Sequence, residues 1–304
     1  MRFQEAARTS PVSTLIAFAF SLLGLTTVFG QQRPLPNADS FLQETKKHLQ
    51  TDSTLQSSYS YVETRRVLRI DSRGQATGES VKVFESYPGL PGEGRWERPI
   101  SEDGKPVPPE QLARLDRERQ QKAEDYARRL ASQPAKTAAD QRREWEKDQQ
   151  ETARIVDDIY RVYNIRMVGR ETIDGHDTIA FSLTARPDAQ PQTREGGMAR
   201  HFAVRAWVSE TDYEVARVEA EATDTVPIAL GLLARVSKGS RLTYERRKVN
   251  GEVWLPASAS YMGSARIALV KTIRRGGSTE YSNYKKFTVG TTTTFETPNS
   301  PGQR

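Results

Sequence analysis

The feature that most constrains the fold is a predicted β-hairpin over Val236–Ser260. Its centre is the dipeptide Asn250-Gly251, and both residue types readily adopt the positive φ that a type I′ turn requires. Before the turn, Leu242 and Tyr244 alternate with polar residues, as in a strand that is buried on one face, and the apolar residues Val253, Trp254 and Leu255 follow the turn. Pro256 is expected to end the second strand, because proline donates no hydrogen bond to a neighbouring strand. The hairpin therefore predicts a sheet built from antiparallel strands.

Most of the remaining chain follows the same pattern of strands joined by short turns. Further strands are expected over Tyr59–Ile70, Ser80–Tyr87, Arg95–Glu97, Arg166–Glu171, Thr178–Ala185, Phe202–Val208, Tyr213–Ala222, Arg266–Ile273 and Thr279–Thr288. The spacing of the turns predicts roughly nine to eleven strands in one curved sheet. The apolar stretch Pro227–Arg235 fits either a helix or a strand, because it has no polar face. Pro187–Gly197 is expected to be a flexible loop.

Helices interrupt the strands in two places. A short helix is expected over Ala38–Gln50, with Asp39 or Ser40 as its N-cap. Two more helices form a strongly charged insertion over residues 108–163, and Thr137 can cap the second of them. Only the second half of that helix has a broad apolar face. We therefore expect this half to pack on the sheet and the first half to project into solvent.

The two ends of the chain are expected to lie outside the sheet. Residues 1–30 begin with basic residues, continue with a short apolar run and end with small residues, which predicts a signal peptide cleaved before Gln31. An uncleaved N-terminal anchor is the alternative, although the apolar run is shorter than the roughly 20 residues that span a bilayer. Residues 291–304 are expected to be a disordered tail. The sequence has no cysteine, which excludes disulfides and thiolate metal sites.

Basic residues are concentrated towards the C-terminus. Arg235–Lys286 contains twelve Lys or Arg and three Glu, a net charge of +9, whereas Glu110–Arg161 contains twelve residues of each sign. A high pI usually indicates nucleic acid, but a partner in the envelope suits an exported protein better. We therefore expect an anionic membrane surface or a phosphate-bearing lipid, and no nucleic acid. The alternative is a solvated sheet face whose cations prevent edge-to-edge pairing.

The sequence contains no catalytic signature. His48, His176 and His201 are the only histidines, and none has a partner at metal-ligand spacing, so no metal site is expected. A serine nucleophile of the G-x-S-x-G type is absent from the sequence. Asp157-Asp158 is interpreted as part of a solvated helix face rather than an acid/base pair. These observations predict a protein that is not an enzyme and has no cofactor.

The order of the elements resembles that of a known superfamily. The pieces that carry the resemblance are Phe41–Leu49, Tyr59–Ile70, Asp71–Gly78, Val81–Tyr87, Arg95–Glu97, Trp207–Ser209, Arg217–Glu219 and the Val-Asn-Gly-Glu-Val-Trp-Leu-Pro hairpin Val249–Pro256. Together they are similar to the periplasmic lipoprotein-carrier superfamily, whose LolA/LolB-like fold is shared with the lipid-sensing domain of sigma-E regulatory proteins. They also resemble outer-membrane lipoprotein-sorting-like proteins. The resemblance extends discontinuously over most of residues 41–286.

The resemblance implies an α+β fold in which a curved antiparallel β-sheet forms an unclosed half-barrel. Covering helices would then enclose a hydrophobic cavity that takes acyl chains, and residues 31–290 would form a single LolA-like β-domain with the charged helical insertion 108–163. The candidate cavity walls are Leu230, Leu232, Trp254, Trp207 and Ile159.

The function that follows is that of an exported periplasmic binding protein, soluble after signal cleavage. It would hold an acyl chain, lipid or lipoprotein in the cavity and take part in outer-membrane lipid or lipoprotein trafficking. The alternative is an envelope sensor or interaction protein that contacts a membrane-surface or protein partner through its charged helical insertion. An enzyme acting on envelope lipids is a third class, and the sequence supports it least because no nucleophile, base or metal set is visible.

Overall fold

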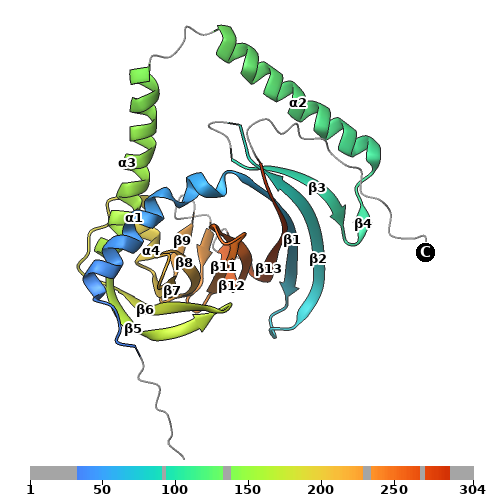
Figure 1. Cartoon of the computed structure of the whole chain (residues 1–304). Coiled ribbons are helices and arrows are strands. Elements are labelled where there is room, and N and C mark those ends of the chain that lie inside the picture. The colour runs from blue at the N-terminus through green and yellow to red at the C-terminus, as the bar shows by residue number, and fades with distance from the viewer. Residues whose placement is uncertain (1–32, 91–93, 133–137, 229–233, 268–270, 288–304) are drawn as a thin grey trace, which may run out of the picture. The chain divides into compact units, whose positions relative to one another are not determined.

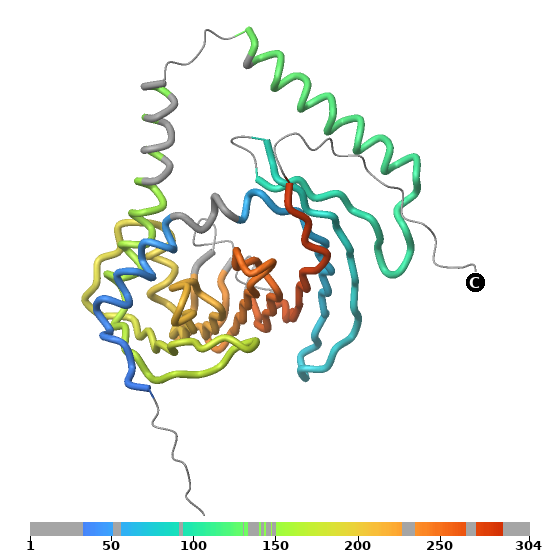
Figure 2. Tube along the Cα trace, viewed as in Figure 1, coloured from blue at the N-terminus to red at the C-terminus, as the bar shows by residue number. Residues whose placement is uncertain are grey.

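The computed structural model of the protein describes residues 33–90, 94–132, 138–228, 234–267 and 271–287 (Figures 1 and 2). The predicted signal peptide 1–30 and tail 291–304 lie outside these residues. In chain order the elements are α1 (Ala38–Gln56), β1 (Tyr59–Ile70), β2 (Ala76–Tyr87), β3 (Trp96–Glu102), β4 (Lys105–Pro106), α2 (Pro109–Ser132), α3 (Ala138–Val162), β5 (Tyr163–Ile173), β6 (His176–Ala185), α4 (Arg194–Ala199), β7 (Phe202–Ser209), β8 (Val215–Ala222), β9 (Val226–Ile228), β10 (Ala234–Val236), β11 (Arg241–Val249), β12 (Val253–Ile267) and β13 (Lys271–Lys286).

The strands form one antiparallel sheet. Eleven of them follow the order β4-β3-β2-β1-β13-β12-β11-β8-β7-β6-β5, and β10 and β9 are added beside the end of β12. Among the described residues, the end strands β4 and β5 do not pair with each other, so the curved sheet is an unclosed half-barrel (Figure 1). The predicted α+β fold class is confirmed. The thirteen strands in the described part of the chain exceed the roughly nine to eleven expected from turn spacing, because β4, β9 and β10 are very short.

The last strand joins the two halves of the sheet, because β13 lies between β1 and β12. It is one strand of sixteen residues, whereas the sequence predicted separate strands over Arg266–Ile273 and Thr279–Thr288. Gly276 and Gly277 lie inside β13. Gly277 pairs with Val67 on β1 and with Tyr261 on β12. A Cβ at Gly277 would lie 2.6 Å from the Tyr261 ring and 2.8 Å from the Arg66 carbonyl oxygen. The glycine pair therefore accommodates close packing here and is not a turn.

The hairpin that constrains the sequence most is formed by β11 and β12. Asn250 and Gly251 have φ values of 54° and 70°, and the Glu252 amide donates to the Val249 carbonyl at 3.1 Å, as expected of a type I′ turn. The second strand does not end at Pro256 but continues to Ile267. Pro256 is tolerated inside the strand because it lies at a shift in the β11–β12 register, where ladder hydrogen bonds are interrupted.

We expect substitution of Gly251 by alanine to destabilise the protein by about 1–2 kcal/mol, because an L-residue is strained at this positive φ. The matched control is Gly169→Ala in β5, where φ is not left-handed and a Cβ would meet no atom within 4 Å. Urea denaturation followed by circular dichroism measures both. Equal stabilities of the two variants would show that the turn conformation does not contribute.

Helices α1 and α2 each begin at a residue type that favours a helix N-terminus. Asn37 caps α1, since its Oδ1 accepts from the Ser40 amide at 3.0 Å, in place of the predicted Asp39 or Ser40. α2 starts at Pro109, and its thin apolar stripe buries Leu112 against the sheet. Within the described residues, no helix is long and apolar enough to cross a membrane.

The charged insertion corresponds to α2 and α3. α2 is joined to β3 by a pair of hydrogen bonds between Arg98 and Asp116, at 2.7 and 3.0 Å. The last turns of α3 are buried, with Val162 fully inaccessible, whereas Arg143, Lys147 and Glu151 nearer its start are exposed. The two halves of α3 thus differ in burial as the apolar pattern predicts.

Candidate functional site

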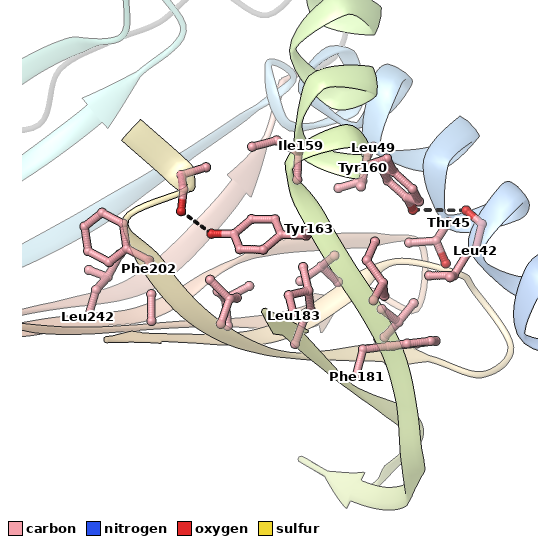
Figure 3. Close-up of a pocket in the computed structure, with 18 residues that line it drawn as sticks. Leu42, Thr45, Leu49, Ile159, Tyr160, Tyr163, Phe181, Leu183, Phe202 and Leu242 are labelled. Atoms are coloured by element: carbon pink, nitrogen blue, oxygen red, sulfur yellow. Dashed lines mark hydrogen bonds between the residues drawn. The ribbon is translucent and has the colours of Figure 1, made fainter. Parts of the chain in front are cut away.

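The floor of the candidate site is the face of the sheet that α1 and α3 cover (Figure 3). One row of directly opposed residues crosses five strands and consists of Ile165, Leu183, Val204, Ala220 and Leu242. A second row consists of Phe181, Ala206 and Val218. Directly opposed residues in neighbouring strands point to the same face. Period-two patterns in five separate strands therefore combine into one apolar surface.

The roof consists of α1 and the end of α3. Leu42 and Leu49, two helical turns apart, are on the same side of α1 and line the site together with Ile159 of α3. The two helices are tied by an ion pair of 2.5 Å between Lys46 and Asp157. The Tyr160 hydroxyl of α3 adds a second tie, because it donates to the Leu42 carbonyl of α1. The roof is thus a fixed pair of helices, with its apolar side chains directed at the floor (Figure 3).

A partly open cavity of about 360 Å³ lies between floor and roof, within the size range of small-molecule sites. Its lining residues are Leu42, Thr45, Leu49, Ile159, Tyr160, Tyr163, Ile165, Phe181, Leu183, Ala199, Phe202, Val204, Ala206, Val208, Val215, Val218, Ala220 and Leu242. None of them is charged. The cavity therefore favours ligands that have a long apolar part.

Only three lining side chains carry a polar atom, and each of these is a hydroxyl that donates to a main-chain carbonyl. Thr45 donates to Phe41 at 3.0 Å, within α1. Tyr160 donates to Leu42 at 3.0 Å, and Tyr163 donates to Ala199. Burial raises the pKa of both tyrosines to about 12. Their hydroxyls stay protonated and hydrogen-bonded to the main chain at neutral pH, so the lining carries no charge.

The short helix α4 closes one side of the cavity and is attached to α3 by Asp158. This carboxylate is 1 % exposed and accepts from the Gln192 and Thr193 amides at 2.8 Å each and from the Thr193 hydroxyl at 2.8 Å. Thr193 in turn caps α4 by accepting from the Gly196 amide at 2.9 Å. Asp158 is therefore not on a solvated face, and Pro187–Gly197 is not wholly a loop, because its end forms the first turn of α4.

Asp158 should make the free energy of unfolding depend on pH in the acidic range. Burial alone opposes its ionisation, but the hydrogen bonds from Thr193 and Gln192 outweigh it and lower the pKa of this carboxyl. Its contribution is then fully present above the ordinary pKa of an aspartate and is lost as pH falls through the lower folded value. We expect Asp158→Asn to weaken this acid dependence, measured as unfolding free energy at a series of pH values. An unchanged pH profile would contradict the assignment.

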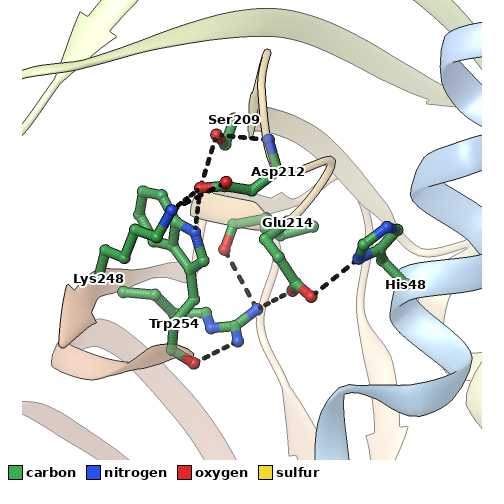
Figure 4. Close-up of polar contacts among 8 residues, drawn as sticks. His48, Ser209, Asp212, Glu214, Lys248 and Trp254 are labelled. Carbon is green, nitrogen blue, oxygen red and sulfur yellow. Dashed lines mark hydrogen bonds and ion pairs between the residues drawn. The ribbon is translucent and has the colours of Figure 1, made fainter. Parts of the chain in front are cut away.

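A polar network holds the middle of α1, at His48 (Figure 4). His48 contacts the buried Glu214 at 3.3 Å, and Glu214 pairs with the buried Arg246 at 3.2 Å. Arg246 also donates to the carbonyls of Val215 and Trp254. Because these partners lie on α1, β8, β11 and β12 and at the turn before β8, the network holds α1 over the sheet.

The same network contains a carboxylate that orders the β7–β8 turn. Asp212 accepts from Lys248 and from the Trp254 indole at 2.9 Å each, and from Ser209 at 3.3 Å (Figure 4). Burial opposes ionisation of Asp212, but the bonds from Lys248 and Trp254 lower its pKa overall. These pairings join the charged side chains of the network to one another. Within the described residues, no group of three His, Asp or Glu side chains is arranged to hold a metal ion.

The predicted cavity walls have different positions. Ile159 lines the cavity. Trp207 follows Ala206 on β7, so its side chain points to the opposite face, where the indole donates to Glu171 at 2.8 Å. Trp254 is buried against His176 and bonded to Asp212, away from the cavity lining. Leu230 and Leu232 lie outside the described residues.

Most of the lining was not singled out from the sequence. The floor residues are the inward-facing members of strands that the sequence does predict, so period-two alternation carried the signal for them. α1 carried a weaker signal, in the spacing of Leu42 and Leu49. Ala199 carried none, because α4 depends on Asp158, which is distant in sequence. The position of the cavity can therefore be inferred only when the register of the whole sheet is known.

The fold and the site together define an α+β half-barrel protein with an apolar, ligand-sized cavity between sheet and helices. Solved structures similar to this chain include a putative outer membrane lipoprotein-sorting protein domain from Vibrio parahaemolyticus (10% identity, TM-score 0.36, 84% of this chain and 95% of that chain). A LolA superfamily protein from Nitrosomonas europaea (13%, 0.27, 84% and 96%) and a DUF1329 family protein from Desulfovibrio piger (14%, 0.30, 84% and 94%) are also similar. One of these matches carries the name of the superfamily that the sequence resembles. No family model and no curated protein matches the sequence.

Proposed function

We propose that this protein is an exported binding protein of the bacterial periplasm that holds an acyl chain between its sheet and its helices. The observation that carries the proposal is the cavity of about 360 Å³, whose polar side-chain atoms all donate to the protein's own backbone. Such a site offers a ligand little besides removal of apolar surface from water. The periplasmic location rests on the predicted signal peptide at residues 1–30.

The energetics favour an alkyl chain as the cavity ligand. Burial of a methylene contributes about 0.8 kcal/mol, so eight buried methylenes contribute roughly 6 kcal/mol before the cost of association. A compact polar ligand would lose its hydrogen bonds to water and find few replacements, which costs about 1–3 kcal/mol for each unpaired group. Acyl chains, carried as free lipids or as part of a lipoprotein in envelope trafficking, have the chemistry that the lining accommodates.

The end of the charged insertion contributes to this site. The end of α3 supplies Ile159 and Tyr160 to the cavity and Asp158 to the attachment of α4. Residues of the insertion thus line the ligand cavity and hold its side wall. Insertion and sheet accordingly form one domain in this proposal, within residues 31–290.

Filling the cavity should abolish binding without unfolding the protein. Ala206 lies in the middle of the floor on β7, so we expect Ala206→Phe to place a ring in the space of the ligand and to lower affinity for a fluorescent fatty acid at least tenfold. The control is Ala203→Phe on the same strand, because Ala203 is exposed and does not line the cavity. Fluorescence titration of the delipidated full chain measures both affinities.

Three results would decide the proposal. Saturable binding to the wild-type chain and to Ala203→Phe, with loss in Ala206→Phe, supports the cavity as the site. Equal affinities of the two phenylalanine variants would move the binding elsewhere on the surface. No saturable binding to the wild-type chain would end the acyl-chain proposal. Circular dichroism spectra establish that both variants are folded.

A further inference from the structure

A second apolar hollow continues the cavity along the same face of the sheet. Its volume is about 330 Å³, and it shares Phe202 and Leu242 with the first cavity. Beyond these residues it is lined by Tyr261, Ile273 and Arg275, among others. Leu242 and Tyr261 are each 44 % exposed, although they are large and mainly apolar. An apolar path thus runs from the cavity under α1 and α3 towards β12 and β13 and ends beside Arg275.

Two arginines oppose each other at the end of this path. Arg69 of β1 and Arg275 of β13 are direct partners in the antiparallel ladder, and directly opposed side chains share a face of the sheet and lie close together. Arg275 lines the second hollow, so both point to the face that carries the cavity. Two like charges in this arrangement repel each other and destabilise the sheet.

Nothing in the described part of the chain neutralises this arginine pair. Neither guanidinium forms an ion pair with a described residue, whereas Arg65 and Arg66 on the same strand each pair with a glutamate. The ladder neighbours on either side are Gly78 and Gly263, which carry no side chain. The guanidinium of Arg69 lies over Gly78, where a Cβ would come within 2.8 Å of it. The space over Gly263 is taken by the Ser240 side chain, whose hydroxyl oxygen would lie 2.5 Å from a Cβ there. The two neighbours in this row therefore add no charge that could compensate the arginines.

Protection of a sheet edge does not explain these cations. β1 and β13 lie in the middle of the strand order, with β2 and β12 outside them, and their backbone groups are already paired. Lysines and arginines that prevent edge-to-edge association belong on edge strands. Arg275 lines the apolar path and Arg69 opposes it in the ladder, a placement that an anionic ligand explains better.

We propose that Arg69 and Arg275 bind the anionic head group, a carboxylate or a phosphate, of an amphiphile whose chain follows the apolar path into the cavity. This inference rests on the proposed function and narrows the ligand to an anion with a single negatively charged head. Guanidinium groups suit this role because they stay charged and donate paired hydrogen bonds to carboxylate or phosphate oxygens. The unfavourable pair of like charges becomes favourable once the anion lies between them.

The test compares four probes on the delipidated full chain by isothermal titration calorimetry below their micelle concentrations. The probes are dodecanoate, its neutral methyl ester, dodecyl phosphate and dodecylamine. The variants are the double substitution Arg69→Gln/Arg275→Gln and the control Arg274→Gln. Arg274 is the matched control because it adjoins Arg275 in the chain, is also exposed and pairs with Ile70, which places it on the opposite face.

We expect the wild-type chain to bind dodecanoate or dodecyl phosphate at least tenfold more tightly than the ester, and the amine most weakly. The double variant should bind the anions as weakly as the ester, with ester affinity unchanged, and Arg274→Gln should behave as wild type. Added salt should weaken anion binding and leave ester binding unchanged. Tighter binding of the phosphate would indicate a phospholipid, and tighter binding of dodecanoate a fatty acid.

The outcomes separate this inference from the proposal on which it rests. Equal affinities of dodecanoate and ester for the wild-type chain would overturn the head-group site and leave the acyl-chain cavity standing. Parallel loss of anion and ester binding in the double variant, with a lowered melting temperature, would show a structural role and overturn the inference as well. If neither the acid nor the ester binds the wild-type chain, the proposed function fails first.

Discussion

Replacement of Arg246 by methionine is expected to lower the free energy of unfolding by about 3–5 kcal/mol, because it leaves a buried charge without its partner. The Arg246 side chain is 3 % exposed and pairs with Glu214 at 3.2 Å. It also donates to the carbonyls of Val215 and Trp254, so its loss leaves one carboxylate and two carbonyl oxygens short of donors. Urea denaturation of the full chain measures the change.

Two further variants make the Arg246 result interpretable. Arg247→Met alters the next residue on β11, which is exposed, and should change stability by no more than about 0.5 kcal/mol. The double variant Glu214→Leu/Arg246→Met removes the pair together and should recover part of the loss, since no buried charge then stays unpaired. A loss below about 1 kcal/mol in Arg246→Met would contradict the role of the network in fixing α1.

The second large effect is expected at Gly196, where α4 meets α3. A Cβ at this residue would lie 2.1 Å from the Asp158 Oδ2 atom and 2.6 Å from its Cγ atom. Gly196→Ala must therefore displace the carboxylate from the Gln192 and Thr193 amides, and buried donors without partners cost about 1–3 kcal/mol each. We expect a loss of about 2–4 kcal/mol, together with weaker acyl-chain binding, because Ala199 of α4 lines the cavity.

Gly197 provides the matched control for this experiment. It is the next residue of the same short helix, and a Cβ there would meet no atom within 4 Å, so Gly197→Ala should leave stability and binding close to wild type. Asp158→Ala removes the same hydrogen bonds from the other side and should destabilise to a similar extent. Similar stabilities of the Gly196 and Gly197 variants would show that Asp158 does not hold α4 in solution.

Local signals in the sequence determined most of the fold. The Asn250-Gly251 turn specified the β11–β12 hairpin, because few residue types tolerate two successive positive φ values. Period-two alternation located the strands of the half-barrel, and the change to a helical period located α2 and α3. Where the expectation was wrong, as at Pro256 and in the division of β13, the strand continued because its neighbours supplied a bulge or close packing.

The site itself was decided by tertiary structure. Register determines which alternating residues share a face, and that is why Trp207 faces away from a cavity that its neighbour Ala206 lines. Burial of Asp158 required the amides of Gln192 and Thr193, which are 34 and 35 residues away. Arg69 and Arg275 oppose each other because the first strand of the chain pairs with the last. Contacts between residues so distant in sequence leave no local pattern, because only the completed sheet brings them together.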